Sequence, residues 1–272
     1  MAGVANGPYR TANSPTRPAD DQRTLAPLGR RSTRVVGRRR YGAYVVLTAA
    51  DPDGPQPAPG QFYMLTAATR WGGGEDERPF LPRAFSVLRA KEGRLEFMLE
   101  AVGPGTERLC ELGPGDGLHV TGPLGNGFAP PRDGRRPVLV GGGVGIAPLV
   151  IFSESLGDVE TLLGFRDSAH AEGAVLIPGA RVATDDGSVG HHGLVTDLLD
   201  LDAAIEIYAC GPPPMLEAIA RLGVPAQLAM ESGMACGFGA CFGCVVPTRE
   251  GYVRLCVDGP VLEAAALEEV AA

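Results

Sequence analysis

The first half of the chain alternates short apolar stretches with polar clusters rich in glycine, proline and aspartate. Stretches of this kind, closely spaced and with little helical periodicity, predict β-strands of a small antiparallel barrel. The clusters at 51–60, 71–79 and 113–117 supply turns between them. The predicted strands are Arg34–Val36, Tyr44–Thr48, Gln61–Leu65, Ala84–Leu88, Leu95–Ala101 and Gly117–Thr121.

The pattern changes after residue 136, where apolar strands begin to alternate with helices. This alternation predicts a doubly wound parallel sheet. The predicted strands are Pro137–Val140, Val159–Phe165, Arg181–Thr184 and Ile205–Ala209. The predicted helices are one that ends near Leu156, then Leu194–Leu199, Pro213–Leu222 and a helical tail at Val261–Ala272.

The chain of 272 residues is long enough for two domains with additional segments. We expect a disordered extension at residues 1–31, because this segment is rich in proline, alanine and polar residues and lacks periodicity. The barrel would span 32–131 and the α/β domain 132–225. A small cysteine-rich segment with a tail would follow at 226–272. The predicted fold class is therefore multidomain, one all-β domain followed by one α/β domain.

Charge and hydropathy exclude several classes of protein. The net charge is −8, and basic residues cluster only between Arg30 and Arg40, which argues against nucleic acid as a partner. The sequence has no apolar run of 18 or more residues, so we expect no membrane span. An apolar signal region is also missing at the N-terminus. A cytoplasmic protein with reduced cysteines is the expectation.

Four cysteines carry the most specific chemical signal. They follow the pattern C-x4-C-x2-C-x11-C, which predicts a [2Fe-2S] cluster bound by Cys236, Cys241, Cys244 and Cys256. Glycines 237, 239 and 243 would let the backbone curl around the cluster and point N–H groups at sulfur. A zinc site and disulfides are the alternatives. Structural zinc usually shows two separated C-x2-C pairs, and disulfides need an oxidising compartment. Cys110 and Cys210 are predicted to be buried.

Two loops at predicted strand ends suggest a nucleotide site. The first contains Gly141, Gly142, Gly143 and Gly145 and opens a helix, so its backbone can approach a pyrophosphate. The second contains Cys210, Gly211 and Pro212. Because ligands of open α/β sheets bind at the carboxyl ends of strands, the two loops together predict a nicotinamide nucleotide site. In the segment 164–167, Asp167 suits the ribose of NAD and Arg166 suits the phosphate of NADP.

The barrel offers candidate contacts for a phosphate and an aromatic ring. On one predicted strand, Arg83 supplies a planar fork for phosphate, Phe85 an aromatic surface and Ser86 a small donor. An ordinary strand with a surface arginine is the alternative. A glycine turn at 102–106 opens a short helix, whose N-terminus also suits phosphate. Among the histidines, we expect His119 to be structural, and the others, His170, His191 and His192, to lie in polar loops.

Taken in chain order, these motifs resemble the ferredoxin–NAD(P)+ reductase superfamily. Within it, they most resemble the electron-transfer subunits of NAD-dependent (class 1B) dihydroorotate dehydrogenases. The resemblance covers residues 32–258, and the compact cysteine loop is its most specific part. The motifs are Arg83–Ser86, Gly103–Thr106, Gly122–Phe128, Gly141–Pro148, Asp185–Ser188, Cys210–Pro212 and Glu231–Cys256.

The resemblance implies three cofactors. It implies FAD on the barrel, NAD over the loops 141–145 and 210–212, and a [2Fe-2S] cluster on the four cysteines. Ala84 stands where the family often has proline. The implied FAD contacts are Arg83, Ala84, Phe85, Ser86, Met98, Leu99, Glu100, Gly105 and Thr106.

The resemblance also implies a role in pyrimidine biosynthesis. Electrons would pass from the FMN of a separate dihydroorotate dehydrogenase subunit, through the cluster and FAD, to NAD+. The complex would contain two copies of each subunit, and its interface is expected around residues 237–246. The chain itself would carry no catalytic residue. The alternatives are an NAD(P)H reductase that serves an oxygenase or a sulfur-metabolising enzyme, and a non-catalytic iron–sulfur redox sensor.

Overall fold

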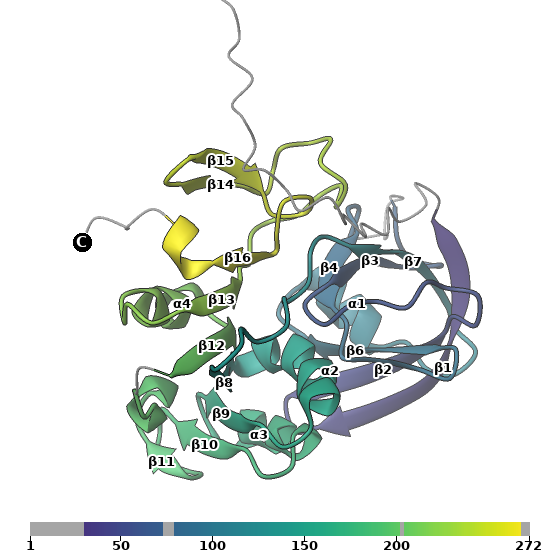
Figure 1. Ribbon diagram of the computed structural model, residues 1–272. Helices are drawn as coiled ribbons and strands as arrows, with labels where there is room; N and C mark the ends of the chain where they lie inside the picture. The colour runs from purple at the N-terminus through teal and green to yellow at the C-terminus, as the bar shows by residue number, and fades with distance from the viewer. Residues whose placement is uncertain (1–29, 73–78, 202–203, 268–272) are drawn as a thin grey trace, which may run out of the picture.

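The structure is a computed structural model that describes residues 30–72, 79–201 and 204–267. It contains two seven-stranded sheets and a small two-stranded sheet (Figure 1). Residues 1–29 of the predicted disordered extension lie outside the described residues. Arg31, which the prediction also included, is the first residue of strand β1. Within the described ranges, every helix is too short or too polar to cross a membrane.

The first sheet is antiparallel throughout and curls into a barrel, which confirms the prediction for this part of the chain (Figure 1). Its strand order is β4-β3-β7-β1-β2-β6-β5. Strand β5 was not predicted, because its three residues are too short and polar to show a pattern. The elements are β1 Arg31–Tyr41, β2 Tyr44–Ala50, β3 Phe62–Ala67, β4 Arg83–Ser86, β5 Arg89–Lys91, β6 Arg94–Glu100, α1 Pro104–Cys110 and β7 Gly117–Leu124.

The second sheet has the order β11-β10-β9-β8-β12-β13-β16, and all its pairs except β13–β16 are parallel. This arrangement confirms the predicted doubly wound domain. Strands β9, β10 and β11 follow β8 in order toward one edge of the sheet. The chain then returns to the other side of β8, where β12 and β13 follow, so the switch in direction lies between β8 and β12. The elements are β8 Arg136–Gly142, η1 Gly143–Ile146, α2 Ala147–Leu156, β9 Glu160–Phe165, α3 Ser168–Ala171, η2 Glu172–Leu176, β10 Arg181–Thr184, β11 His191–His192, η3 Val195–Leu198, β12 Ile205–Cys210, α4 Pro213–Ala220 and β13 Ala226–Ala229.

Three sequence-based assignments differ from the structure in this domain. Strand β13 pairs with β12, so the sheet continues beyond the boundary predicted after residue 225. The predicted helical tail begins instead as strand β16, Val261–Glu263, followed by a 3₁₀ turn, η4 Ala264–Ala266. Strand β16 pairs antiparallel with β13, and this edge pairing overrides a weak local helix preference. The predicted helix at 194–199 is likewise only a 3₁₀ turn, η3.

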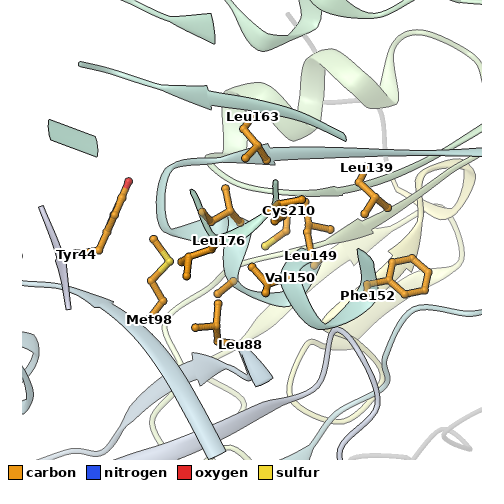
Figure 2. Packing of buried hydrophobic residues seen from close by; sticks show 14 of the residues in the cluster. Tyr44, Leu88, Met98, Leu139, Leu149, Val150, Phe152, Leu163, Leu176 and Cys210 are labelled. Carbon is orange, nitrogen blue, oxygen red and sulfur yellow. The ribbon is translucent and has the colours of Figure 1, made fainter. Parts of the chain in front are cut away.

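A shared hydrophobic core joins the barrel to the parallel sheet. Tyr44, Leu88 and Met98 extend from the barrel side toward Leu149 and Leu176 of the α/β domain (Figure 2). All five are at most 6% exposed, so water is excluded from the contact. The backbone N–H of Ala43 also donates to the carbonyl oxygen of Ala169 at 3.1 Å. The two domains are therefore held in one relative position.

The cysteine-rich segment leaves β13 and packs on the barrel before it returns to the sheet as β16. It contains a hairpin formed by β14 Val245–Thr248 and β15 Gly251–Arg254, near the top of Figure 1. Leu255 is fully buried and belongs to a cluster with Phe62, Met64 and Leu124 of β3 and β7. This apolar contact fixes the segment against the barrel wall.

Candidate functional site

The β14–β15 hairpin explains why the fourth cysteine follows the third after only 11 residues. Val245 pairs with Arg254, so the residues just outside the hairpin also meet. The backbone N–H of Leu255 donates to the carbonyl oxygen of Cys244 at 3.1 Å. The sulfur atoms of Cys244 and Cys256 consequently lie 3.2 Å apart in a buried position. All six cysteines are free thiols in this structure.

The other two cysteines lie on the loop before the hairpin, where the backbone favours an anionic sulfur. Burial alone would raise the pKa of Cys236, but backbone N–H groups of Phe238, Cys241 and Ala240 outweigh it and lower the pKa to about 6. Glycines 237 and 239 have positive φ angles, which the curled loop requires. A Cβ at Gly237 would lie 2.5 Å from Met64, so this position needs glycine for space as well.

The four cysteines are donors of the kind that binds an iron–sulfur cluster. Burial and the neighbouring Cys244 raise the pKa of Cys256 to about 12, so a second thiolate here needs a cation beside it. Among the described residues, no three histidine, cysteine or acidic side chains converge on a point where one ion could bind. Cys236, Cys241, Cys244 and Cys256 would supply the four thiolates that a [2Fe-2S] cluster takes from a protein.

A cavity of about 600 Å³ lies at the carboxyl ends of the parallel strands, at the switch in strand order. The two predicted loops meet at its floor. A Cβ at Gly145 would lie 2.6 Å from the carbonyl oxygen of Cys210, and a Cβ at Gly142 would lie 2.7 Å from Pro212. Because these glycines allow two backbones to pack closely, the loops form one continuous surface of the kind that binds a dinucleotide.

The cavity also contains polar residues that sequence reasoning did not place there. Tyr44 and Glu100 reach it from the barrel, and His170 and Asp185 reach it from the α/β domain, where the predicted Arg166 also lines it. His170 does not lie in a polar loop as expected: it belongs to α3, is 8% exposed and packs edge-on against Tyr44 at 5.5 Å. Its signal in the sequence was the preceding Asp167, which caps α3 through its side chain.

The predicted phosphate contacts on the barrel come together around Arg83. A Cβ at Gly105, in the first turn of α1, would lie 2.5 Å from Arg83 Nε, so the guanidinium lies directly over this turn. Arg83 also lies 5.9 Å from the centre of the Trp71 ring. Phe85 and Ser86 are half-buried on the same edge strand, next to this position. A guanidinium over a helix N-terminus fits the pyrophosphate of FAD.

Other predicted flavin contacts are placed differently. The side chains of Met98 and Leu99 are buried in the two hydrophobic cores, so only their backbone could face a ligand. Glu100 turns into the nucleotide cavity instead. The Thr106 hydroxyl accepts hydrogen bonds from the N–H groups of Val102 and Gly103, so it stabilises the turn before α1. Ala84 is exposed.

The fold and the paired sites define the class of ferredoxin reductase-like oxidoreductases. A solved NADH-dependent reduced ferredoxin-NADP oxidoreductase is 25% identical, with a TM-score of 0.73 over 87% of this chain and 89% of that one. The ferredoxin reductase in carbazole 1,9a-dioxygenase is 24% identical, with a TM-score of 0.61 over 74% of this chain and 68% of that one, and supports the fold alone.

Sequence relatives narrow this class to one family. The model for the iron-sulfur cluster binding domain of dihydroorotate dehydrogenase B matches residues 231–268. The dihydroorotate dehydrogenase B (NAD(+)) electron transfer subunit of Caldanaerobacter subterraneus subsp. tengcongensis is 36% identical over 241 residues, 84% of this chain and 94% of that protein. The same subunit of Geobacillus kaustophilus is 40% identical over 226 residues, 76% and 85% of the two chains. This chain belongs to the family of dihydroorotate dehydrogenase B electron transfer subunits.

Proposed function

We propose that this protein accepts electrons from the FMN of a partner dihydroorotate dehydrogenase and delivers them to NAD+, in pyrimidine biosynthesis. The observation that carries the proposal is the position of the cysteine loop, which packs on the barrel. The same barrel presents Arg83, and its residues Tyr44 and Glu100 line the nucleotide cavity. In such a chain the [2Fe-2S] cluster supplies one-electron transfer, and FAD links it to the two-electron chemistry of NAD.

The residues of the chain bind and orient these groups. Cys236, Cys241, Cys244 and Cys256 would hold the cluster, and N–H groups around Cys236 would stabilise the charge on sulfur. Arg83 over the first turn of α1 would fix the pyrophosphate of FAD. The loops at Gly142–Gly145 and Cys210–Pro212 would hold NAD at the carboxyl ends of β8 and β12. Tyr44 lines the cavity, and Tyr44 and Met98 belong to the buried core that holds the two domains together beside it.

The direct test measures two activities of the purified protein. With NADH and a dye the chain alone should reduce the dye, whereas oxidation of dihydroorotate with NAD+ should need the partner subunit. Dihydroorotate oxidation by the chain alone would refute the two-subunit model. Absence of dye reduction would favour the redox sensor, and dye reduction without any partner-dependent dihydroorotate oxidation would favour a reductase serving another enzyme.

We expect NADH to be preferred to NADPH in the same assay. Three carboxylates, Glu100, Asp185 and Glu231, line the cavity, and they would repel the additional 2′-phosphate of NADPH. The measurement is kcat/KM for each nucleotide in dye reduction. A higher kcat/KM for NADPH would contradict this assignment.

Arg83→Ala should weaken the binding of FAD by about 1.5–3 kcal/mol, because it removes a charge-assisted contact to the pyrophosphate. The measurement is the dissociation constant of FAD for the wild-type apoprotein and for the Arg83→Ala apoprotein. Arg70→Ala is a matched control, since this exposed arginine pairs with Glu111 on the barrel surface. Equal affinities for FAD in wild type and Arg83→Ala would place the flavin elsewhere.

The partner is expected to dock over the cysteine loop. Phe238 is 51% exposed and Phe242 63% exposed, and exposed aromatic residues often form the centre of a protein interface. Electron transfer also requires the cluster to lie near the partner's flavin. A complex with two copies of each subunit remains our prediction, to be checked by its mass in solution.

We expect the protein in the cytoplasm, because this reducing compartment suits its six free cysteines.

A further inference from the structure

Among the residues that the structure describes, Arg166 is the one arginine or lysine that lines the nucleotide cavity, and it is already paired with other side chains. Its Nη2 atom lies 2.6 Å from Glu100 Oε1, and its Nε atom donates to His170 Nε2 at 2.9 Å. Asp167 Oδ2 is 3.8 Å from the same Nε. The guanidinium therefore has two carboxylates along its Nε–Nη2 edge, although Arg166 itself is more than half exposed.

The carboxylate at 2.6 Å comes from the other domain. Glu100 ends β6 of the barrel, where it pairs with Tyr44, and its side chain is only 20% exposed. His170 contacts the same carboxylate, with its Nε2 atom 3.2 Å from Glu100 Oε1. It is held in place because its Nδ1 atom lies 2.6 Å from Asp167 Oδ1 and its ring packs against Tyr44. Tyr44 belongs to the core between the domains, so the residues packed against it keep their position across the domain boundary.

The strand end at which Arg166 lies is where a parallel sheet distinguishes the two nicotinamide nucleotides. An acidic residue there binds the ribose 2′-hydroxyl of NAD, and an arginine accommodates the 2′-phosphate of NADP. The segment after β9 contains both, Arg166 and Asp167, so the local sequence leaves the choice open. A phosphate would need the guanidinium to be free of carboxylates, because two anions cannot share it without mutual repulsion.

We propose that Glu100 is a specificity-determining residue, which pairs with Arg166 from across the domain boundary and thereby denies this cation to the 2′-phosphate of NADP. The proposal rests on the proposed function, in which this cavity binds the nicotinamide nucleotide. Asp185, on the next strand end, adds a further negative charge to the cavity. The flavin-binding domain thus sets the nucleotide preference of the α/β domain.

Glu100→Gln tests the proposal, because it keeps the size of the side chain and removes its charge. We expect the ratio of kcat/KM for NADPH to that for NADH to rise about tenfold, the effect of one charge-assisted hydrogen bond. The affinity for adenosine 2′,5′-bisphosphate, measured by calorimetry against AMP, should rise similarly. This second readout does not depend on FAD or on the cluster. In the double variant with Arg166→Ala and Glu100→Gln, the increase in the kcat/KM ratio and the increase in affinity for the bisphosphate should both disappear.

Glu154→Gln is the matched control. Glu154 pairs with Arg89 across the same two domains but outside the nucleotide cavity, so neither ratio should change. Unchanged ratios in Glu100→Gln, with a melting temperature near that of wild type, would overturn the proposal. If that variant does not fold, Glu100→Ala is measured by the same binding assay. A wild-type protein that binds neither nucleotide would instead refute the proposed function.

Discussion

Cys256→Ser should yield a protein without the visible absorbance of an iron–sulfur cluster and without partner-dependent oxidation of dihydroorotate. Cys256 and Cys244 lie 3.2 Å apart in the same buried pocket, so each completes a pair of sulfur ligands. A serine hydroxyl is a poor substitute, because [2Fe-2S] clusters in proteins of this type require thiolates. Serine variants of Cys236, Cys241 and Cys244 should behave in the same way. Iron and sulfide analysis of the purified variants measures the effect.

The matched controls are Cys110→Ser and Cys210→Ser. Both residues are buried cysteines, at 7% and 2% exposure, and neither lies in the cysteine loop. Their variants should keep a full complement of iron, even where stability falls. A Cys256→Ser protein with its full iron content would show that the ligand set is different. NADH-dependent dye reduction should survive in all four ligand variants that retain FAD.

Phe242→Asp should reduce partner-dependent oxidation of dihydroorotate by about tenfold or more, the effect of losing an aromatic residue at the centre of an interface. Phe242 is 63% exposed, and the Arg254 side chain lies over its ring at 5.4 Å. Its positive φ angle of 58° is rare for an aromatic residue, so the loop presents this side chain at a cost in backbone strain. NADH-dependent dye reduction by the isolated chain should remain.

Val175→Asp is the control for this substitution. Val175 is also 63% exposed, but it lies in η2 of the α/β domain, directly after α3. Figure 1 shows α3 at the end of the molecule opposite to β14 and β15. Affinity for the partner, measured with iron-loaded protein, should fall for Phe242→Asp and stay constant for Val175→Asp. Equal affinities in both variants would move the interface away from the cysteine loop.

Much of the fold was predictable because its signals are local. Alternating short strands predicted the barrel, and strand–helix alternation predicted the parallel sheet, as the structure confirms. Elements whose identity depends on a neighbour were not predictable. Strand β16 lies in a segment with a helical composition and exists because β13 offers an open edge. The short strand β5 is likewise defined by its pairing with β6.

The sequence by itself determined the chemistry that the chain can offer: four cysteines at ligand spacing, two glycine-containing loops at strand ends, and an arginine on a barrel strand. Each of these signals lies within one short segment, so it can be read from the sequence alone. The tertiary structure decided how these groups meet. Glu100 and Arg166 are 66 residues apart and belong to different domains, so only the packing of the shared core brings them to 2.6 Å. A local pattern has no information about such a contact, because it arises from the docking of two independently patterned surfaces.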